Sequence, residues 1–398
     1  MTSDAASGGP GTAPLPAAVD VVIVGGGVIG ASVAFHLAEA RAGRVLLVER
    51  DTPASGSSGK PVGGVRAQFS DPVNVRLGQR SLEAWRAFGE RPGADVGLER
   101  VGYLFLLADE AEVETFRRGL EVQHAHGVPS RLLTPGAAHA LCPYVDPSSF
   151  VAAAHSPADG YALPGAAVRG YLRAAEALGA TVRTRCAVTG VETSGGTVRA
   201  VRTTAGTVRT GTVVCAAGAW SRAIGAMAGV TLPVTPLRRQ IALTGPLSPA
   251  PPRVPFTLDY GSTLYFHNDG AGGVVLGMSD PRQEPGFGRE FTEDWLELFR
   301  EAAARCAPPL ARLPVTGGWA GLYEMTPDRN ALIGEARGVS RFLYATGFSG
   351  HGFLQAPAVG EVVRDLYLGR SPVVDVGPLT ADRFTGPATA PRAEAHVI

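Results

Sequence analysis

The first strongly patterned part of the chain is a short apolar run at residues 19–24, VDVVIV, which leads into a cluster of glycines. Beyond the glycines, apolar positions recur at helical spacing as far as Ala38, and a second apolar run, VLLV, covers residues 45–48. Two β-rich runs on either side of a helical pattern predict a strand, a tight turn, a helix and a second strand. A membrane span of the same length is the alternative, but the glycines and His36 argue against it.

Three glycines at the turn, Gly25, Gly27 and Gly30, have the spacing G-x-G-x-x-G. The first glycine of such a turn allows the tight bend, the second lets the backbone approach a pyrophosphate, and the third lets the helix pack closely on the sheet. Phosphates then lie at the positive end of the helix dipole, and Glu49 is placed to accept hydrogen bonds from an adenosine ribose. The pattern predicts a dinucleotide site, with a glycine-rich turn before a buried helix as the alternative.

A Ser- and Gly-rich stretch at residues 52–68 follows the second strand, where an NAD domain would normally continue with further strand and helix units. Its hydroxyls and amides could contact phosphate or sugar-chain oxygens, and its glycines allow the backbone to lie against a flat ring. We interpret it as a second cofactor-contacting loop, and a flexible surface loop is the alternative.

Two later segments repeat the change from strand to helix. Residues 211–221 predict a buried strand that ends in small residues, with a helix from about Ser221. Residues 341–353 predict a strand and a Gly-rich turn that lead into a helix over 354–368. We therefore expect a discontinuous nucleotide-binding domain made of residues 19–98, 156–232 and 328–388.

The remaining segments, residues 99–155 and 233–327, are expected to form a substrate-binding domain. They contain a helical pattern near residues 110–126 and strand patterns at 257–267 and 273–278. These strands would form a separate sheet that covers the reactive face of the cofactor. Residues 1–18 are expected to be a disordered leader and residues 389–398 a flexible tail.

Composition and charge are typical of a globular protein. The 398 residues are 45% hydrophobic and 18% charged, which is enough for a sizeable core and two domains. A net charge of zero favours neither nucleic acid nor an anionic membrane as a partner. The four cysteines show no metal-binding spacing, so we expect no metal site and reduced thiols in a soluble, cytoplasmic protein.

Five motifs together resemble those of the FAD-dependent amine and amino-acid oxidoreductases of the D-amino-acid oxidase superfamily. They are the fingerprint at residues 25–49, SSGKPVGGVR at 57–66, AAG at 216–218, WAGLYEMTPD at 319–328 and GFSGHGF at 347–353. The likeness is strongest to the sarcosine oxidase and dimethylglycine dehydrogenase group, including sarcosine oxidase β-type subunits. It implies an α/β (α+β) two-domain fold, with a Rossmann-like FAD-binding domain of discontinuous segments and a mixed-sheet substrate domain with helices.

The resemblance also implies which residues contact the cofactor, which we expect to be non-covalently bound FAD. The predicted FAD-binding residues are Gly25, Gly27, Val28, Ile29, Gly30, Glu49, Arg50, Ser57, Ser58, Lys60, Gly63, Gly64, Val65, Val188, Ala217, Gly218, Trp220, Gly321, Gly347, Ser349, Gly350, His351, Gly352 and Phe353.

A flavin that accepts a hydride at N5 accumulates negative charge around N1, so positive potential is expected there. The turn at residues 347–352, at the start of the last helix, offers this potential through backbone amides. His351 in this turn is the acid–base candidate. The alternative is a ring that packs beside the flavin or caps the helix.

Arg66 and Tyr265 complete the predicted catalytic set. Arg66 follows two glycines of the flavin loop and could hold a carboxylate bidentately, or could be a surface residue. Tyr265 falls where sarcosine oxidase relatives carry a pocket aromatic, and His267 would share its strand face. An ordinary sheet position is the alternative for Tyr260, Tyr265 and His267. The predicted substrate pocket consists of Tyr260, Tyr265, His267, Trp319, Tyr323 and Leu354.

The chain departs from monomeric sarcosine oxidases at three positions. Gly321 stands where they attach FAD through a cysteine, which excludes covalent attachment by that route. Val275 stands where they carry a lysine thought to help oxygen react with reduced flavin. Leu354 replaces a lysine for the substrate carboxylate, so the substrate lacks that carboxylate, binds it through an arginine, or is bulkier and more apolar.

We therefore expect an FAD-dependent oxidase or dehydrogenase that oxidises the C–N bond of a secondary amine or amino acid, of sarcosine/N-methyl or cyclic type, to an imine. O2 or another acceptor would take the electrons. Two alternatives stay open: a 2-hydroxyacid oxidoreductase, which needs a stronger base, and a β-type subunit that requires partner chains. A homo-oligomer is also compatible with the sequence.

Overall fold

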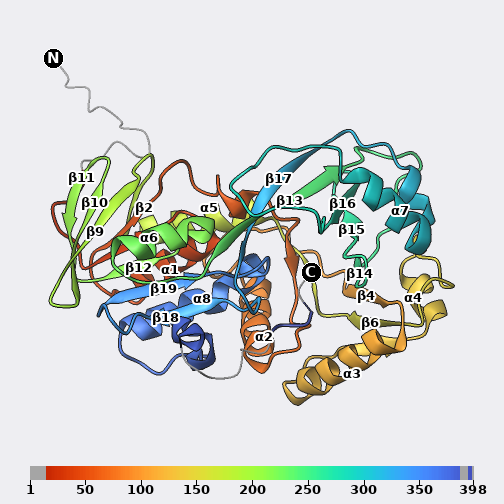
Figure 1. Cartoon of the computed structure of the whole chain (residues 1–398), viewed down its shortest axis with the longest axis horizontal. Coiled ribbons are helices and arrows are strands. Elements are labelled where there is room, and N and C mark those ends of the chain that lie inside the picture. The colour runs from red at the N-terminus through yellow and green to blue at the C-terminus, as the bar shows by residue number, and fades with distance from the viewer. Residues whose placement is uncertain (1–14, 386–392, 397–398) are drawn as a thin grey trace.

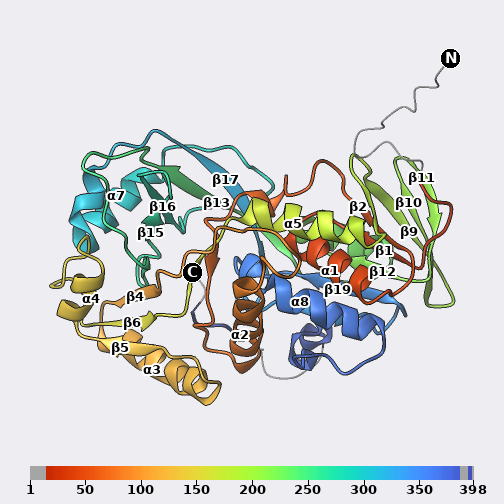
Figure 2. The same ribbon diagram turned by 180° about the vertical axis from the view of Figure 1, so that it is seen from behind.

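The computed structural model describes residues 15–385 and 393–396, and it consists of two halves that are each built on one large sheet (Figures 1 and 2). The fold class predicted from the sequence is confirmed: one half has a mostly parallel nucleotide-binding sheet and the other a mixed sheet.

The first sheet has six strands in the order β18-β19-β12-β1-β2-β8. Their bounds are β1 Val21–Val24, β2 Val45–Val48, β8 Thr181–Arg183, β12 Val213–Cys215, β18 Leu332–Glu335 and β19 Phe342–Thr346. All neighbours run parallel except β18 and β19. Both faces of this sheet are covered, which explains why its inner strands β1, β2 and β12 are continuous apolar runs.

Successive residues of β1 face different layers. Val21 and Ile23 belong to the core beneath three helices, and Val22 and Val24 belong to the core on the other face. The three helices are α1 Val28–Glu39, α5 Pro164–Ala177 and α8 Gly352–Tyr367. The other face is covered by a three-stranded sheet, β9 Val188–Ser194, β10 Thr197–Thr203 and β11 Gly206–Arg209, and by α6 Ser221–Met227.

The second sheet has eight strands in the order β17-β13-β16-β15-β14-β4-β6-β5. Their bounds are β4 Tyr103–Leu107, β5 Arg131–Leu133, β6 Ala152–Ser156, β13 Thr235–Leu243, β14 Phe256–Asp259, β15 Tyr265–Asn268, β16 Val274–Met278 and β17 Gly317–Met325. Helices α3 Glu110–Ala125, α4 Pro135–Leu141 and α7 Leu296–Cys306 pack around this sheet (Figure 1).

The two faces of the eight-stranded sheet have different roles. Leu104 and Leu106 of β4 pack in the core that contains α7, whereas Tyr103 and Phe105 belong to an aromatic cluster on the other face. This aromatic face also carries Tyr265, and it closes a cavity at the junction of the two halves.

Several short elements lie outside the two large sheets. They are a two-stranded ribbon of β3 Gly64–Val65 and β7 Gly160–Tyr161, the helix α2 Pro72–Arg86, and the 3-10 turns Ser57–Gly59, Gly218–Trp220, Pro308–Arg312, Gly377–Leu379 and Ala381–Phe384. Helix α2 packs against α8 and begins at Asp71, whose carboxylate accepts hydrogen bonds from the backbone N–H groups of Val73 and Asn74.

The ends of the described chain are both attached to the fold. Residues 15–18 end the predicted leader, and Ala18 bridges to Arg209 of β11; residues 1–14 lie outside the described residues. The predicted flexible tail does not extend over residues 393–396, because Glu394 is buried at the start of α2 and His396 is buried against Phe116 of α3. Residues 389–392 and 397–398 of that tail lie outside the described residues.

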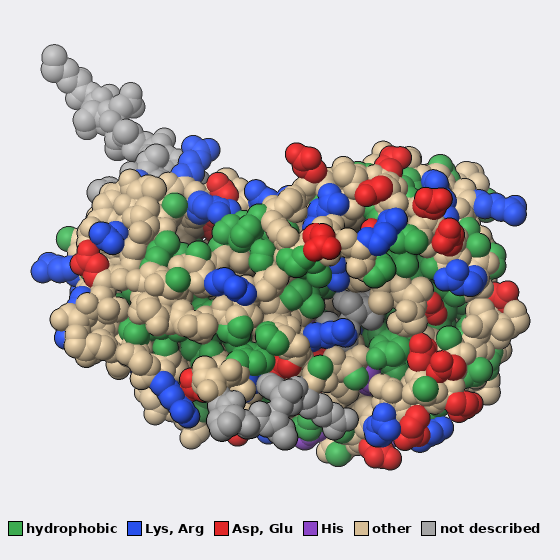
Figure 3. Space-filling view, viewed as in Figure 1, with side chains coloured by type: hydrophobic (Ala, Val, Ile, Leu, Met, Phe, Trp, Pro, Cys, Tyr) green, Lys and Arg blue, Asp and Glu red, His purple; other side chains and the backbone are tan. Residues whose placement is uncertain are grey.

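The surface seen in Figure 3 carries basic and acidic side chains close to one another over the half that contains the eight-stranded sheet. Among the described residues, no helix combines the length and the apolar character needed to cross a bilayer. The four cysteines are buried and free, as expected. Within residues 15–385 and 393–396, no group of three or more His, Cys, Asp or Glu side chains could hold a metal ion.

Candidate active site

Two adjoining cavities lie where the sheets meet, and they share Val28, Ile29, Ser57, Ser58 and Glu324. We call them the nucleotide cavity and the inner cavity. The nucleotide cavity lies at the carboxyl ends of β1, β2 and β12, the edge at which ligands bind in such sheets. The inner cavity lies between residues 57–66 of the Ser- and Gly-rich stretch, the turn 349–354 and the aromatic face of the second sheet.

The turn after β1 requires its glycines. Gly25 has a φ of +116°, and a Cβ there would lie 2.3 Å from the carbonyl oxygen of Ala216. A Cβ on Gly30 would lie 1.9 Å from the carbonyl oxygen of Gly25. The close packing expected of this turn is therefore present, with the start of α1 directed toward the nucleotide cavity.

Glu49 lines the nucleotide cavity and also braces the turn. Its Oε2 accepts a hydrogen bond from the Gly26 N–H at 2.7 Å, and its Oε1 accepts one from the Asp51 N–H at 2.8 Å. Arg50 next to it lies over the Trp220 ring, 4.2 Å from the ring centroid. Both carboxylate oxygens are thus held in place, and the ribose contact of Glu49 stays a prediction.

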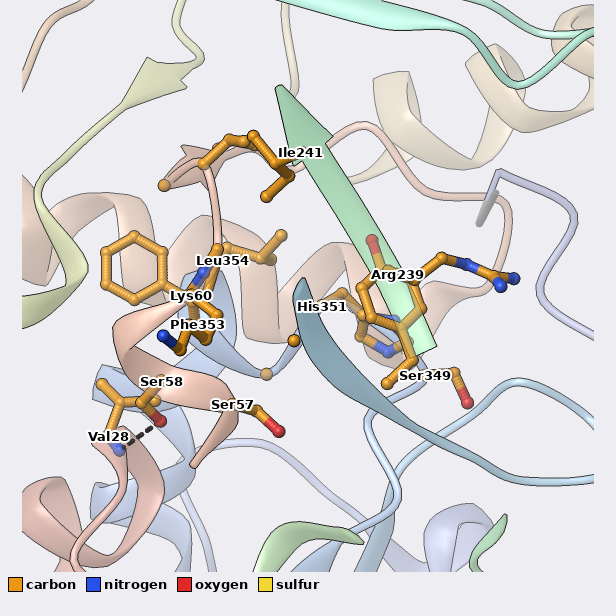
Figure 4. A pocket seen from close by; sticks show the side chains of 18 of the residues that line it. Val28, Ser57, Ser58, Lys60, Arg239, Ile241, Ser349, His351, Phe353 and Leu354 are labelled. Carbon is orange, nitrogen blue, oxygen red and sulfur yellow. Dashed lines mark hydrogen bonds between the residues drawn. The ribbon is translucent and has the colours of Figure 1, made fainter. Parts of the chain in front are cut away.

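The Ser- and Gly-rich stretch lies against the start of α1. The Val28 N–H donates to Ser58 Oγ at 2.8 Å, the dashed line in Figure 4, and Ser57 Oγ donates to the carbonyl of Leu322 at 2.7 Å. Lys60 lines the inner cavity, and its carbonyl accepts from Trp319 Nε1 at 2.6 Å. The stretch is therefore tied to both halves and lines both cavities.

The turn before α8 has an unusual backbone. Gly347, Ser349 and Gly350 have positive φ values of 70°, 49° and 101°, and a Cβ on Gly350 would lie 2.4 Å from the Tyr323 ring. The Gly347 N–H and the Thr346 hydroxyl donate to Glu324 Oε2 at 3.1 and 3.0 Å. The amide of Gly347 is thus held by Glu324, while residues 349–354 line the inner cavity.

Glu324 lies between the two cavities, deep in the protein. Burial raises the pKa of Glu324 to about 7, although the donors on Gly347 and Thr346 oppose the shift. The carboxyl group is therefore partly protonated at neutral pH, next to the place where the two cavities join.

We expect Glu324→Gln to change the pH dependence of stability. A raised carboxyl pKa stabilises the fold below the ordinary value near 4.5 and costs stability as pH rises through about 7. After discounting for water in the cavity, the buried charge costs about 1–2 kcal/mol at pH 8. Thermal unfolding of the apoprotein should find the variant more stable than wild type at pH 8 but not at pH 4. An equal difference at both pH values would contradict the assignment.

The inner cavity is walled by aromatic rings and two arginines. Tyr103, Phe256, Tyr265 and Tyr323 line it, and burial raises the pKa of Tyr265 well above its usual range, so its phenol is neutral. The Tyr265 ring lies over Gly277, where a Cβ would be 2.1 Å from the ring. This glycine therefore allows the ring to lie across the sheet.

Arg239 and Arg66 are the two arginines of the inner cavity. Figure 4 shows Arg239 at the end of the cavity opposite Val28 and Ser58. Burial lowers the pKa of Arg239, and its buried Nε has no hydrogen-bond partner among the described residues. A buried donor without a partner indicates a place for a ligand acceptor.

Arg66 lines the inner cavity and is held in place by two backbone carbonyls. Its NH1 donates to the carbonyl of Gln68 and its NH2 to the carbonyl of His396 at 2.6 Å, and its guanidinium lies 4.1 Å from the centroid of the Phe69 ring. Its side chain is 6% exposed, so the expected surface alternative is excluded.

His351 lines the inner cavity and lies edge-on to Phe69, with ring centroids 5.5 Å apart. Neither ring nitrogen has a partner among the described residues. Burial and the charge of Arg66 hold the pKa of His351 well below its usual range. The imidazole is therefore neutral and only weakly basic at neutral pH.

Most of the predicted site residues come together. Those that line the nucleotide or the inner cavity are Gly25, Gly27, Val28, Ile29, Glu49, Arg50, Ser57, Ser58, Lys60, Gly63, Gly64, Arg66, Val188, Ala217, Gly218, Trp220, Tyr265, Gly321, Tyr323, Ser349, Gly350, His351, Gly352, Phe353 and Leu354.

Six predicted residues line neither cavity: Gly30, Val65, Tyr260, His267, Trp319 and Gly347. His267 does share the face of Tyr265, but its ring packs between Phe256 and Tyr161 at 4.7 and 4.5 Å. Tyr260 is turned toward the carbonyl of Ala395, to which its hydroxyl donates at 2.8 Å. Their sequence positions indicated the right part of the sheet, but did not show that the cavity ends before it reaches these two side chains.

The sequence interpretation missed several lining residues. They are Tyr103, Arg239, Ile241, Phe256, Leu258 and Glu324. Arg239 and Ile241 are two residues apart on β13, so strand alternation along residues 235–243 would have placed both on one face. The pairing with β17 that brings them to the cavity leaves no signal in the sequence.

The sequence model of the family described as "FAD dependent oxidoreductase" (DAO) matches residues 20–366. The chain belongs to this family. DAO-family proteins similar to it include 4-methylaminobutanoate oxidase (formaldehyde-forming) of Paenarthrobacter nicotinovorans, 29% identical over 94% of this chain and 46% of that protein. Mitochondrial dimethylglycine dehydrogenase of Mus musculus is 26% identical over 92% of this chain and 44% of that protein. The chain thus spans about half the length of these two relatives.

A solved structure is similar over nearly its whole length. L-proline dehydrogenase from P. horikoshii superposes with a TM-score of 0.87 and 34% identity, covering 93% of this chain and 99% of that one. The likeness to the dimethylglycine and sarcosine dehydrogenase group is confirmed, and the family to which the chain belongs is one of FAD-dependent oxidoreductases.

Proposed function

We propose that the chain binds FAD non-covalently across both cavities and oxidises the C–N bond of an N-alkylated amino acid, removing a hydride from the carbon next to nitrogen and leaving an imine. The observation that carries this proposal is a cavity lined by aromatic rings and by Arg66 and Arg239, which adjoins the nucleotide cavity. The compounds named for the similar proteins, 4-methylaminobutanoate, dimethylglycine and L-proline, are all carboxylates with an alkylated nitrogen.

Several features fit non-covalent FAD. The glycine turn and the start of α1 suit the pyrophosphate, and the nucleotide cavity beside Trp220 suits the adenosine. Gly321 lines the inner cavity, and of the four cysteines only Cys186 lines either cavity. When bound, FAD supplies the hydride acceptor, N5. Precipitating the purified protein with acid should leave the flavin in the supernatant; flavin in the pellet would contradict non-covalent binding.

Arg66 and Arg239 would hold the substrate carboxylate. Arg66 keeps three of its five donors beyond those given to Gln68 and His396, and Arg239 offers its buried Nε. Leu354, which stands in place of the family's carboxylate lysine, also lines this cavity. An arginine-bound carboxylate is thus the preferred one of the three interpretations of Leu354.

The aromatic walls would favour the neutral amine, which is the form able to lose a hydride. Low polarity and two nearby cations both disfavour an ammonium group in the inner cavity. Tyr103, Phe256 and Tyr265 would exclude water and fix the angle of the α-carbon. No strong base is needed for this step.

His351→Asn distinguishes this proposal from a 2-hydroxyacid oxidoreductase. A hydroxyl proton must be removed as the hydride leaves, and this requires a base with a pKa near the working pH. Because the pKa of His351 lies well below that range, we expect the variant to keep kcat/KM for an N-methyl amino acid within about tenfold. If the variant lost all turnover and the wild-type protein oxidised a 2-hydroxy acid, the 2-hydroxyacid oxidoreductase would be favoured.

Val275→Lys tests the choice of electron acceptor. Val275 lies opposite His267 on β16, on the sheet face that carries Tyr265. If the missing lysine limits the reaction with oxygen, the variant should speed the reoxidation of reduced flavin by about 10- to 100-fold. Val275→Met is the uncharged control of similar length. No gain over this control in stopped-flow reoxidation would show that the position does not govern the acceptor.

A further inference from the structure

The segment Ala393–His396 crosses the junction of the two halves, behind Arg66. It lines neither cavity, but the His396 carbonyl accepts from Arg66 NH2 at 2.6 Å. On the opposite side, Arg66 faces the inner cavity. The guanidinium is thus held from behind by a segment that is more than 300 residues away in the sequence.

The carboxylate of Glu394 anchors this segment. Its Oε1 accepts from the N–H and the hydroxyl of Ser70 at 2.8 and 2.6 Å, and its Oε2 accepts from the Asp71 N–H and Asn74 Nδ2, both at 3.0 Å. Burial opposes the charged form, yet the neighbouring His396 and the hydrogen bonds from Ser70 hold the pKa of Glu394 below its usual range. Such charge-assisted hydrogen bonds are about twice as strong as neutral ones.

The rest of the segment is fixed by both halves of the protein. The Glu394 N–H donates to the carbonyl of Asp328 at 3.1 Å, and the Ala395 carbonyl accepts from the Tyr260 hydroxyl at 2.8 Å. The His396 ring stacks on Phe116 of α3 with centroids 4.0 Å apart. Gly119 makes room for this ring, because a Cβ there would lie 2.3 Å from Cε1 of His396.

We propose that Ala393–His396 is a positioning segment that holds Arg66 in the orientation needed to bind the substrate carboxylate. Arg66 offers the Gln68 and His396 carbonyls one edge of its planar guanidinium and keeps the remaining donors for a ligand. Without the segment, Arg66 would be free to adopt other rotamers, and ordering it again would weaken carboxylate binding. This inference rests on the proposed function, since it assigns Arg66 to the carboxylate.

The test measures binding of a carboxylate that cannot be oxidised. Benzoate is titrated into the holoprotein by calorimetry, for the wild type, Glu394→Gln and, as the control, Ala393→Ser at an exposed position of the same segment. In Glu394→Gln, an amide NH₂ group replaces one carboxylate oxygen and faces the donors that this oxygen had accepted from. Because two donors cannot bond each other, we expect the segment to be released. We expect its Kd for benzoate to rise about tenfold, with the control unchanged.

Gly119→Ala is a second route that does not touch the anchor. Alanine favours the helix, but its Cβ displaces the His396 ring. We expect a rise in the Kd of the same direction with no loss of thermal stability. In steady state, both variants should raise KM for an N-methyl amino acid and leave kcat within about twofold.

Coupling to Arg66 separates positioning from a general structural effect. In an Arg66→Met background, Glu394→Gln should change the benzoate Kd no further. An unchanged Kd in Glu394→Gln, or an equal loss in both backgrounds, would overturn the inference. A lower Kd would also overturn it, by showing that the segment competes with the ligand. Because benzoate binding needs no turnover, failure of the proposed oxidation would leave this result interpretable.

Discussion

Arg239→Met is expected to lower kcat/KM for an N-alkylated amino acid by about 100-fold. The side chain is the cavity cation with a buried donor that has no partner among the described residues, and a bidentate charged contact to a carboxylate accounts for that loss. Methionine fills much of the same space, so the cavity should keep its shape. The effect should fall on KM, since the carboxylate lies away from the bond that is broken.

The neighbouring arginine provides a matched control. Arg238 lies on the same strand but lines neither cavity, and it donates to Gln283 Oε1 at 2.7 Å and to the carbonyl of Glu290 at 3.0 Å. Arg238→Met should leave kcat/KM within about twofold. An amine without a carboxylate should not distinguish Arg239→Met from the wild type. An equal loss of kcat/KM for the N-alkylated amino acid and for the amine without a carboxylate would show that Arg239 shapes the cavity and does not bind the carboxylate.

Gly30→Ala is expected to weaken FAD binding by about 100-fold, equivalent to about 3 kcal/mol. Alanine suits a helix better than glycine, so the helix itself should not suffer. The added Cβ would lie 1.9 Å from the Gly25 carbonyl oxygen, and the turn that we expect to hold the pyrophosphate would have to move. The flavin retained after dialysis, measured against protein concentration, gives the affinity.

Gly136→Ala is the control for this substitution, because nothing lies within 4 Å of a Cβ at that helical position. The control should bind FAD as the wild type does, with the same far-ultraviolet circular dichroism in both variants. Wild-type FAD affinity in Gly30→Ala would show that the turn is not part of the cofactor site.

Local pattern was sufficient to predict the nucleotide-binding sheet. The run at residues 19–24, the glycine spacing and the helical period after Gly30 depend on neighbouring residues, and the structure has β1, α1 and β2 there. The segments at 211–221 and 341–353 were predicted in the same way. The repeated pattern predicted that these segments belong to one discontinuous domain, and in the structure they supply β12 and β19 of the same sheet.

The inner cavity was only partly predictable, because it depends on contacts between distant residues. Arg239 lines the inner cavity because β13 pairs with β17. Glu324 lines both cavities because it lies between them. Trp319 was assigned to the pocket but donates to the carbonyl of Lys60, behind the lining. The composition of residues 389–398 indicates a flexible tail. In the structure, the Glu394 carboxylate accepts hydrogen bonds from several donors that are distant in the sequence, and no local pattern predicts these contacts.

Anaerobic reduction of the bound flavin tests the central claim most directly. The purified holoprotein is mixed without oxygen with N-methyl amino acids, cyclic imino acids, amines lacking a carboxylate, and 2-hydroxy acids, while absorbance at about 450 nm is followed. We expect rapid bleaching by at least one carboxylate-bearing secondary amine, and much slower bleaching by its carboxylate-free analogue. Bleaching by 2-hydroxy acids alone, or equal rates with and without the carboxylate, would contradict the central claim.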